Sequence, residues 1–301
     1  MYDTVTLKVR PIYIDPEILN QQSPNTVTFY SEETGALNRS YKIYDEKLPF
    51  IKYIEISQTL SIQVSIPKFL YGNNVTLLTE SDIPRFFDGL QERINDLFSV
   101  QIPHSEWTIS RCDVCWNFQV GEDVSEYARL LSKQQFAYKN TTVYNQDETV
   151  EYRNKSSRFM FYDKHKQTKK TKESSDIIER SQGILRLEVS PSDNDMKKYS
   201  STRKAVELLS KPFFEYMIGK VLGEIEYTEE VSDIGLSWLM NNKENISKIE
   251  TILGFQMLQR IFDESTLRQI YTSSTFANRK NLAKKMTIPK GNCLEPLAIN
   301  Q

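Results

Sequence analysis

Two short segments pair an arginine with an acid at a spacing of two residues. Asp113 follows Arg111 in R-C-D, and Glu188 follows Arg186 in R-L-E. Both segments are strand-like, and residues two apart on a strand project from the same face, so each acid would lie beside its arginine. One interpretation is two structural ion pairs, which are common in proteins. The other is that Asp113 and Glu188 bind Mg²⁺ or Mn²⁺, which prefer oxygen ligands, while the arginines orient them or bind phosphate.

A basic stretch follows Tyr152 and is interleaved with aromatic residues. From Arg153 to Lys172 it has eight Lys and Arg residues and a single acid, Asp163. A charge run of this kind is usually a solvated loop. A groove for single-stranded nucleic acid, however, needs cations for the backbone and rings that stack on the bases. The candidate DNA-binding residues of this stretch are Arg153, Lys155, Arg158 and Lys166.

Tyrosine is the candidate nucleophile. Its unperturbed pKa is about 10, so attack on a phosphodiester needs a divalent ion that polarises the phosphate and cations that stabilise the phenolate. The chain has 16 tyrosines, most of which must be structural. Tyr144, Tyr152 and Tyr162 lie in the basic region, and they are therefore the candidates.

Other chemistries lack their motifs. The sequence has no G-x-x-x-x-G-K-[ST] loop of an NTPase and no G-x-S-x-G of a hydrolase. Its two histidines, His104 and His165, have no H-x-H spacing, although His165 could be an accessory ligand. Cys112 and Cys115 form a C-x-x-C with no second pair to complete a zinc site, so we expect buried, reduced thiols. The net charge of −2 means that any contact with nucleic acid must come from local basic patches.

Hydrophobic periodicity predicts an α+β fold. Alternating apolar residues indicate strands near residues 1–10, 60–66, 106–120, 140–144, 149–152, 158–164 and 183–190. Helical spacing indicates helices from about 81 to 97, 123–136 and 201–222, and residues 67–74 read as a turn. This order predicts a mostly antiparallel sheet with helices packed on one face. The other face would stay open and polar and would carry the site.

Two domains are expected. Residues 1–222 would form the α+β nicking domain, and residues 223–301 a helical C-terminal region that binds DNA or a partner. The acidic cluster of Glu224, Glu226, Glu229, Glu230 and Asp233 would mark the link. Segments 264–271 and 276–285 form a helix-turn-helix-like pattern with a basic end. No apolar run approaches ~18 residues, and the chain begins with no signal-like segment, so we expect a soluble protein of the cytoplasm.

At four places the sequence resembles the gene II/gene X family, the rolling-circle replication initiators of filamentous phages and related plasmids. The resemblance runs over about residues 60–190, and its motifs are moderately specific as an ordered set. They are V-S-I-P-K-F-L-Y-G-N-N (Val64–Asn74), W-T-I-S-R-C-D-V (Trp107–Val114), T-V-E-Y-R-N-K-S-S-R-F-M-F-Y-D-K (Thr149–Lys164) and L-R-L-E-V (Leu185–Val189). Such initiators nick one strand at an origin, stay joined to the 5′ phosphate through tyrosine, leave a 3′ hydroxyl as primer, and later reseal the displaced strand.

The resemblance implies roles for particular residues. It implies that Tyr152 is the nucleophile, that Asp113 and Glu188 are metal ligands, and that Arg111, Arg186 and Lys164 bind or orient phosphate. The family often has Gly or Ser after this tyrosine, where this chain has Arg153-Asn154. Tyr162 and Tyr144 therefore stay open as nucleophiles.

The leading hypothesis is a rolling-circle replication initiator: a metal-dependent, site-specific DNA endonuclease and strand transferase. It would bind origin DNA in a bacterial host cell and work with a host helicase and polymerase, with no membrane contact. A relaxase of a mobile element would use nearly the same chemistry. A sequence-specific DNA-binding protein that controls replication without catalysis is the main alternative, and a structural protein with scaffold ion pairs is the third class.

Overall fold

The computed structural model describes residues 1–23, 25–30, 35, 37–145, 148–227, 236–286, 288 and 294–299. The chain forms two compact units, Met1–Ile225 with Leu297–Gln301, and Glu226–Pro296. The sequence analysis placed this boundary after residue 222. Of the acidic residues expected at the link, Glu229, Glu230 and Asp233 lie outside the described residues.

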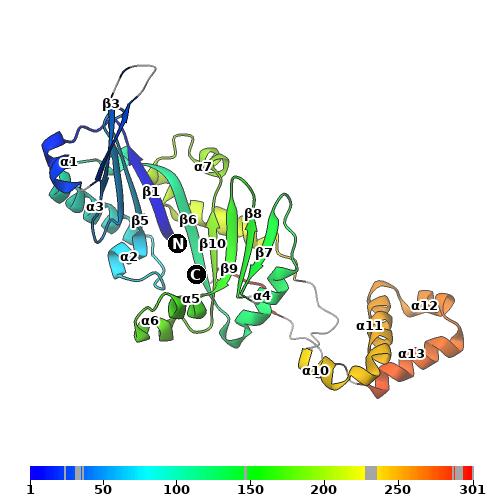
Figure 1. Cartoon of the computed structure of the whole chain (residues 1–301). Coiled ribbons are helices and arrows are strands. Elements are labelled where there is room, and N and C mark those ends of the chain that lie inside the picture. The colour runs from blue at the N-terminus through cyan, green and yellow to red at the C-terminus, as the bar shows by residue number, and fades with distance from the viewer. Residues whose placement is uncertain are drawn as a thin grey trace. The chain divides into compact units, whose positions relative to one another are not determined.

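The first unit is built on one antiparallel sheet of ten strands, in the order β2-β3-β4-β5-β1-β6-β10-β9-β8-β7. Figure 1 shows it with β3 toward one edge, β1 and β6 in the middle and β7 at the other edge. This architecture confirms the predicted α+β class. The strands are β1 (Tyr2–Val9), β2 (Asn25–Tyr30), β3 (Leu37–Ile43), β4 (Phe50–Ile54), β5 (Thr59–Ser65), β6 (Thr108–Gln119), β7 (Asn140–Tyr144), β8 (Thr149–Arg153), β9 (Arg158–Asp163) and β10 (Ile184–Ser190).

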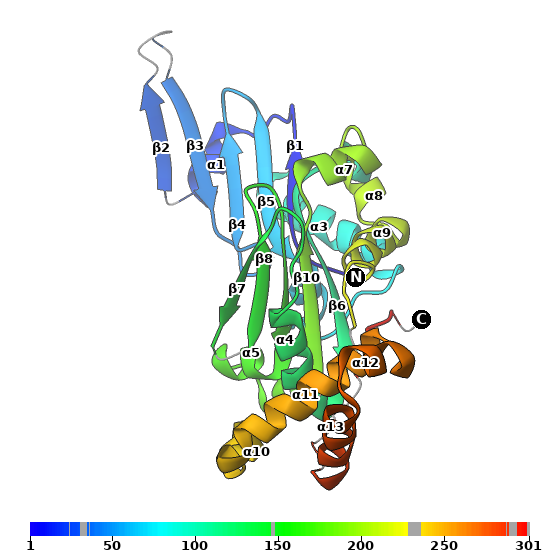
Figure 2. The same ribbon diagram turned by 90° about the vertical axis from the view of Figure 1, so that its right-hand side faces the viewer.

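The sheet consists of two halves with the same topology. In each half, a long central strand (β1 or β6) leads into a short helix, α1 (Pro16–Gln22) or α4 (Val124–Ser132). The next four strands of the chain then follow one another from the outer edge of the sheet back to its centre. The last of the four, β5 or β10, pairs with the central strand of its own half, β1 or β6. The halves join where β1 pairs with β6. Figure 2 shows β2 beside β3 at the edge of the first half.

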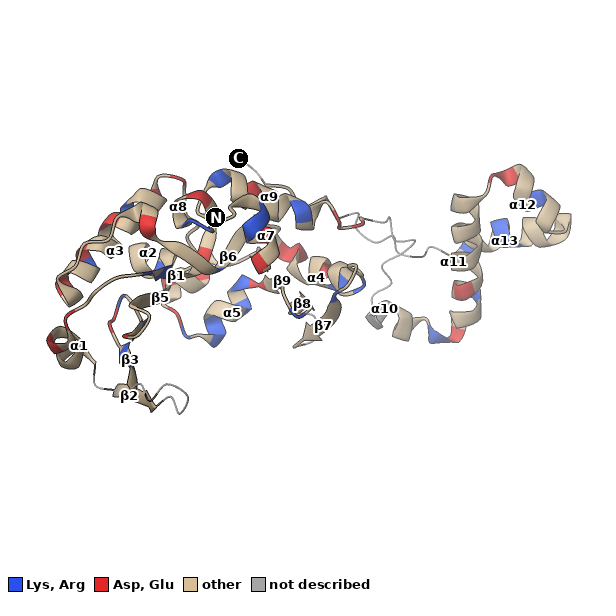
Figure 3. Cartoon of the chain, turned by 90° about the horizontal axis from the view of Figure 1, so that it is seen from above, with Lys and Arg blue, Asp and Glu red and all other residues tan. Residues whose placement is uncertain are grey.

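Apolar side chains on one face of the sheet pack under helices. In α3 (Asp82–Phe98), Phe87, Leu90 and Ile94 recur at helical spacing and are buried, as predicted. On the second half, Trp116 of β6 lies against Phe214 of α9 (Lys211–Leu222), with ring centroids 5.4 Å apart. Figure 3 shows α3, α8 (Ala205–Leu208) and α9 on one side of the strands and α5 (Lys164–Lys170) on the other.

Three segments differ from the prediction. The expected turn at residues 67–74 begins as a helix, α2 (Ile66–Tyr71), which tolerates Pro67 in its first turn and ends at Gly72 in the left-handed region. The expected Lys-rich loop contains α5, whose N-terminus is capped by the Asp163 carboxylate, and α6 (Ser175–Arg180). The single helix expected over 201–222 is two, because Ser210 caps a new helix, α9, which begins at Lys211 and has Pro212 in its first turn. A further helix, α7 (Asp193–Tyr199), follows β10.

The second unit is helical. It contains α10 (Leu236–Asn241), α11 (Ile246–Ile261), α12 (Glu264–Ile270) and α13 (Ser273–Lys285), and the last two match the expected pair of short helices. Phe255, Leu267 and Phe276 form one of its small cores. Within the described part of the chain, no helix is long and apolar enough to cross a membrane.

The Phe255→Ala substitution is expected to unfold this helical unit. Phe255 is buried between Tyr271 and Phe276, and truncating such a ring costs about 3–5 kcal/mol. Hydrogen exchange should then show lost protection from α11 to α13, with β6 and β10 unchanged. Met257→Ala, on the exposed side of the same helix, is the control. Lost protection in β6 or β10 would contradict two separately stabilised units.

Candidate functional site

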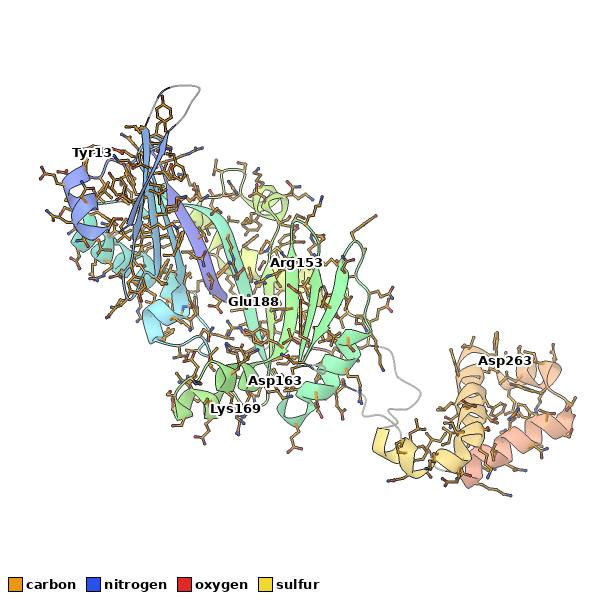
Figure 4. All side chains as sticks on the ribbon, in the orientation of Figure 1. Tyr13, Arg153, Asp163, Lys169, Glu188 and Asp263 are labelled. Atoms are coloured by element: carbon orange, nitrogen blue, oxygen red, sulfur yellow. The ribbon has the colours of Figure 1, made fainter. Side chains whose placement is uncertain are left out.

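Three carboxylates lie on the open face of the second half of the sheet, and we call them the carboxylate site: Asp113, Glu151 and Glu188. They come from β6, β8 and β10. Glu151 and Glu188 share one row across the sheet, because both pair with Met160 of β9. The period-two alternation of each strand turns these acids to the face opposite the helix-covered core. Figure 4 shows Glu188 near the middle of the sheet, and Asp163 and Lys169 at one end beside α5.

Arg158 of β9 bridges the carboxylate site. Its guanidinium donates to Glu188 Oε1 at 3.4 Å and lies 3.8 Å from Glu151 Oε1. Its Nε donates to Ser190 Oγ at 3.3 Å, and that hydroxyl donates to Asp113 Oδ1 at 2.6 Å. The three acids are therefore joined through one guanidinium and one hydroxyl.

The two arginines of the sequence motifs behave differently. Arg111 donates to Asp113 at 2.7 Å, so the predicted pair forms, and half of its side chain is exposed at the site. Arg186 is fully buried and donates to Asp3 Oδ2 at 2.9 Å and to the Asn74 carbonyl oxygen at 2.5 Å. It therefore holds the interior together and has no exposed surface with which to contact DNA.

Tyr144 of β7 is the tyrosine that the structure brings to the carboxylate site. Its hydroxyl donates to Glu151 Oε2 at 3.0 Å, and 44% of the residue is exposed. The hydrogen bond to Glu151, together with the charge of that carboxylate, raises the pKa of Tyr144. A tyrosine hydroxyl and a carboxylate are thus in direct contact; Tyr144 is exposed, and Glu151 is buried.

Glu151 is a site residue that the sequence analysis missed. It follows the sequence-predicted strand alternation, with Val150 and Tyr152 on the other face. The sequence could not supply the strand register. The register puts Glu151 of β8 next to β7, which carries Tyr144, and in the same row as Glu188. The signal available was an acid flanked by apolar residues in an otherwise basic segment.

Tyr152, the nucleophile that the resemblance implied, lies on the opposite face. It is fully buried, its ring stacks on Phe159 with centroids 4.8 Å apart, and its hydroxyl donates to the Leu131 carbonyl oxygen in α4. Burial raises the pKa of Tyr152. The structure does not bring Tyr152 together with Asp113 and Glu188, because a sheet separates them.

Tyr162 lies near the end of β9, and Lys164 is the first residue of α5. Tyr162 shares the face of Glu188 but is only 8% exposed, and burial raises its pKa. Lys164 is buried; its ammonium donates to Asn74 Oδ1 at 2.9 Å and Gln167 Oε1 at 2.8 Å. Burial, with the positive charge of Arg186, lowers the pKa of Lys164 to about 7.

A cavity of about 240 Å³ lies between the carboxylate site and α5. Its lining includes Glu188, Tyr162, Thr149 and Lys166, and Lys166 also pairs with Glu148 at 3.1 Å. The remaining predicted DNA contacts, Arg153 and Lys155, are exposed at the end of β8 and in the turn that follows. Among the predicted cations, Arg111 and Arg158 therefore contact the carboxylate site and Lys166 lines the cavity beside it, whereas Arg186 and Lys164 are buried.

The predicted cysteine and histidine roles have these outcomes. Cys112 and Cys115 are buried and free, and burial raises the pKa of both thiols. Cys293 lies outside the described residues. The Nδ1 atom of His165 lies 2.9 Å from the Ile178 carbonyl oxygen, so this ring packs against α6.

Burial and the acids nearby raise the pKa of Glu188. The causes are burial, then the negative charges of Asp113 and Asp3. The oxygen donors suit Mg²⁺ or Mn²⁺, and a cation would relieve this repulsion. Among the described residues, however, no three His, Cys, Asp or Glu side chains form a group that could hold a metal ion. Arg158 lies between Glu151 and Glu188, so it would have to move for an ion to bind both.

No known family model matches the chain, and a search of curated proteins finds no match. The resemblance to rolling-circle initiators therefore stays a prediction.

Glu188→Gln is expected to stabilise the protein at pH 8. The raised pKa means that the folded state holds the Glu188 proton to higher pH than the unfolded chain, so wild-type stability falls as pH rises through that range. The substitution removes this loss and should raise the unfolding free energy by on the order of 1 kcal/mol at pH 8. The gain should shrink toward pH 4.

The measurement is urea unfolding in EDTA across this pH range. Glu148→Gln, which removes a half-buried carboxylate paired with Lys166 beside the same cavity, is the control. Equal effects of the two substitutions at every pH would contradict the crowding of acids around Glu188.

Proposed function

We propose that this chain is a metal-dependent DNA-nicking enzyme of the rolling-circle initiator type, with Tyr144 as its nucleophile. The observation that carries the proposal is the hydrogen bond from the hydroxyl of the exposed Tyr144 to Glu151, a carboxylate that Arg158 and Ser190 link to Glu188 and Asp113. Arg111, which is exposed, and Arg158, which is half-buried, pair with these acids and supply the positive charge that a phosphodiester substrate requires.

Glu151 is the general base in this proposal. As the Tyr144 oxygen attacks phosphorus, Glu151 accepts the hydroxyl proton, the bond from phosphorus to the 3′ oxygen breaks, and that oxygen takes a proton from solvent. The product is a 5′-phosphotyrosine and a free 3′ hydroxyl. In religation a 3′ hydroxyl attacks the phosphotyrosine and loses its proton, and Glu151 returns a proton to Tyr144.

The other site residues bind and orient the phosphate. Arg158 and Arg111 supply positive charge on either side of Asp113, and charge developing on the phosphate oxygens is stabilised by such groups. Asp113 and Glu188 are the residues that would hold Mg²⁺ or Mn²⁺, whose chemistry when bound is to polarise the scissile phosphate.

Two other hypotheses keep some support. A DNA-binding protein without catalysis is favoured by the pairing of the three carboxylates with Arg111 and Arg158, which would then be structural. A relaxase would use the same site, and the geometry favours neither enzyme over the other. Cytoplasmic location and work with a host helicase and polymerase stay predictions.

The Tyr144→Phe substitution is expected to abolish covalent attachment to DNA, because no oxygen remains to attack phosphorus. The assay uses supercoiled plasmid carrying the replicon's own origin, with Mg²⁺ or Mn²⁺, and detects nicked circles and protein–DNA adducts on a denaturing gel. Tyr152→Phe is the matched control: it should cost about 1 kcal/mol of stability from the lost hydrogen bond and leave adducts unchanged.

The outcomes separate the hypotheses. Adducts that persist with Tyr144→Phe but vanish with Tyr162→Phe would identify Tyr162 as the nucleophile. Wild-type protein that binds this DNA but never nicks it with either metal would favour the non-catalytic alternative.

Glu151→Gln tests the base separately. The amide cannot accept the Tyr144 proton, so nicking should slow by roughly 10²- to 10⁴-fold while DNA affinity stays within about twofold of wild type. Glu148→Gln is the control, because the Glu148 carboxylate pairs with Lys166, whereas the Tyr144 hydroxyl donates to Glu151. Full activity of Glu151→Gln would remove Glu151 from the mechanism.

A further inference from the structure

The open face of the first half of the sheet differs in charge from that of the second half. Its outward-facing strand residues are lysine, serine, threonine, asparagine, glutamine and a few apolar residues. Among the described residues of β1–β5, the one acid on this face is Asp3, which is buried against Arg186. The two halves share a topology, but carboxylates gather on only one of them.

Three lysines lie in one row across this half, and we call them the lysine row. Lys42 of β3 is directly opposite Lys52 of β4, Lys52 is opposite Ser61 of β5, and Ser61 is opposite Lys8 of β1. Neighbouring strands are about 4.8 Å apart, so the row spans roughly 14 Å. Lys8 and Lys42 are exposed and Lys52 is half-buried.

The lysine row has no counter-charge among the described residues, none of which forms an ion pair with it. Like charges directly opposite on neighbouring strands destabilise a sheet, so the Lys42–Lys52 pair costs stability. Lysines often protect edge strands from aggregation, but Lys8 and Lys52 lie on interior strands. An anionic ligand accounts for the row better.

Aromatic rings and hydrogen-bond donors accompany the lysines. Phe29 and Phe50 are 55% and 42% exposed on this face, where they pair with Asn38 and Gln63. Cations in a row with exposed rings and hydroxyl or amide groups are the features of a single-stranded nucleic-acid surface. An acidic protein has no bases, so binding it would not require exposed rings for stacking.

The lysine row is continuous with the carboxylate site. Thr6, two residues from Lys8 on the same face of β1, pairs with Arg111 of β6, and Arg111 donates to Asp113. A strand lying across β3, β4, β5 and β1 would therefore reach Arg111 and then the acids.

We propose that the open face of β1–β5 binds the backbone of single-stranded DNA next to the nicking site, with Lys8, Lys42 and Lys52 as its phosphate contacts. The identity of the strand rests on the function proposed above. One half of the sheet holds the strand and the other half cuts it.

The test compares full-length wild type with the triple variant Lys8→Gln, Lys42→Gln, Lys52→Gln. Binding of a fluorescent 20-nucleotide oligothymidine is measured by anisotropy from about 50 to 300 mM salt. The matched control removes the same charge from α7 and α9 on the covered side: Lys197→Gln, Lys198→Gln, Lys211→Gln. Circular dichroism verifies that both variants fold.

The lysine-row variant should bind roughly 10- to 100-fold more weakly at 150 mM salt, and the slope of log affinity against log salt should fall by about 2, because each lost phosphate contact on a single strand contributes about 0.7. The control should change neither. Equal effects of the two triple variants would show that net charge, not this face, governs binding, and would overturn the proposal. So would unchanged DNA affinity with altered sedimentation, which would assign the face to a second copy of the chain.

Adduct formation at saturating origin DNA separates this inference from the proposed function. If wild type forms no adduct but the lysine-row variant loses binding, the nicking function fails and the DNA-binding face stands. If adducts form and depend on Tyr144 while the lysine-row variant binds DNA like the control, the proposed nicking function stands and the proposal that this face binds DNA is overturned.

Discussion

The pairing of β1 with β6 is the interaction on which the rest of the structure depends. These strands lie at the centre of the ten-stranded sheet and join its two halves. Each is also the strand against which the last strand of its own half closes. The Cys115 N–H donates to the Met1 carbonyl oxygen at this junction. Without the pair, each half would expose a long hydrogen-bonding edge, which is unfavourable in water and prone to aggregate.

A continuous sheet with one covered face determines where chemistry can occur. Helices α3, α4 and α9 bury the apolar residues, so the polar residues of every strand must share the remaining face. On the second half this alternation gathers Asp113, Glu151 and Glu188, and burial together with mutual repulsion raises the pKa of Glu188. On the first half it aligns lysines, and the one acid on that face among the described residues of β1–β5 is the buried Asp3.

A buried polar cluster closes one end of this face. Arg186 connects β10 to Asp3 of β1 and to the Asn74 carbonyl oxygen, and Lys164 bonds the Asn74 side chain from α5. Removing one partner from such a cluster leaves an unpaired buried charge, which is strongly destabilising. Arg186 and Lys164 therefore stabilise the end of the sheet that borders the candidate site. They would act by positioning the site residues.

Local pattern was sufficient for β1, β5–β10 and helix α3 but not for α2, α5, α6 or α7, and contacts between distant residues decided the site. Alternation in residues 60–66 and 183–190, and the 3.6-residue spacing of Ile83, Phe87 and Leu90, determine strands and helix because burial of one face depends only on nearby residues. The same pattern placed Asp113 and Glu188 on one polar face, as found. Pairing register and the order of strands depend instead on contacts between residues far apart in the chain. They put Tyr152 under α4, brought Tyr144 to Glu151, and turned Arg186 inward to Asp3. A strand's sequence shows which residues share a face, but only the tertiary structure decides which face helices cover and which residues of other strands stand opposite.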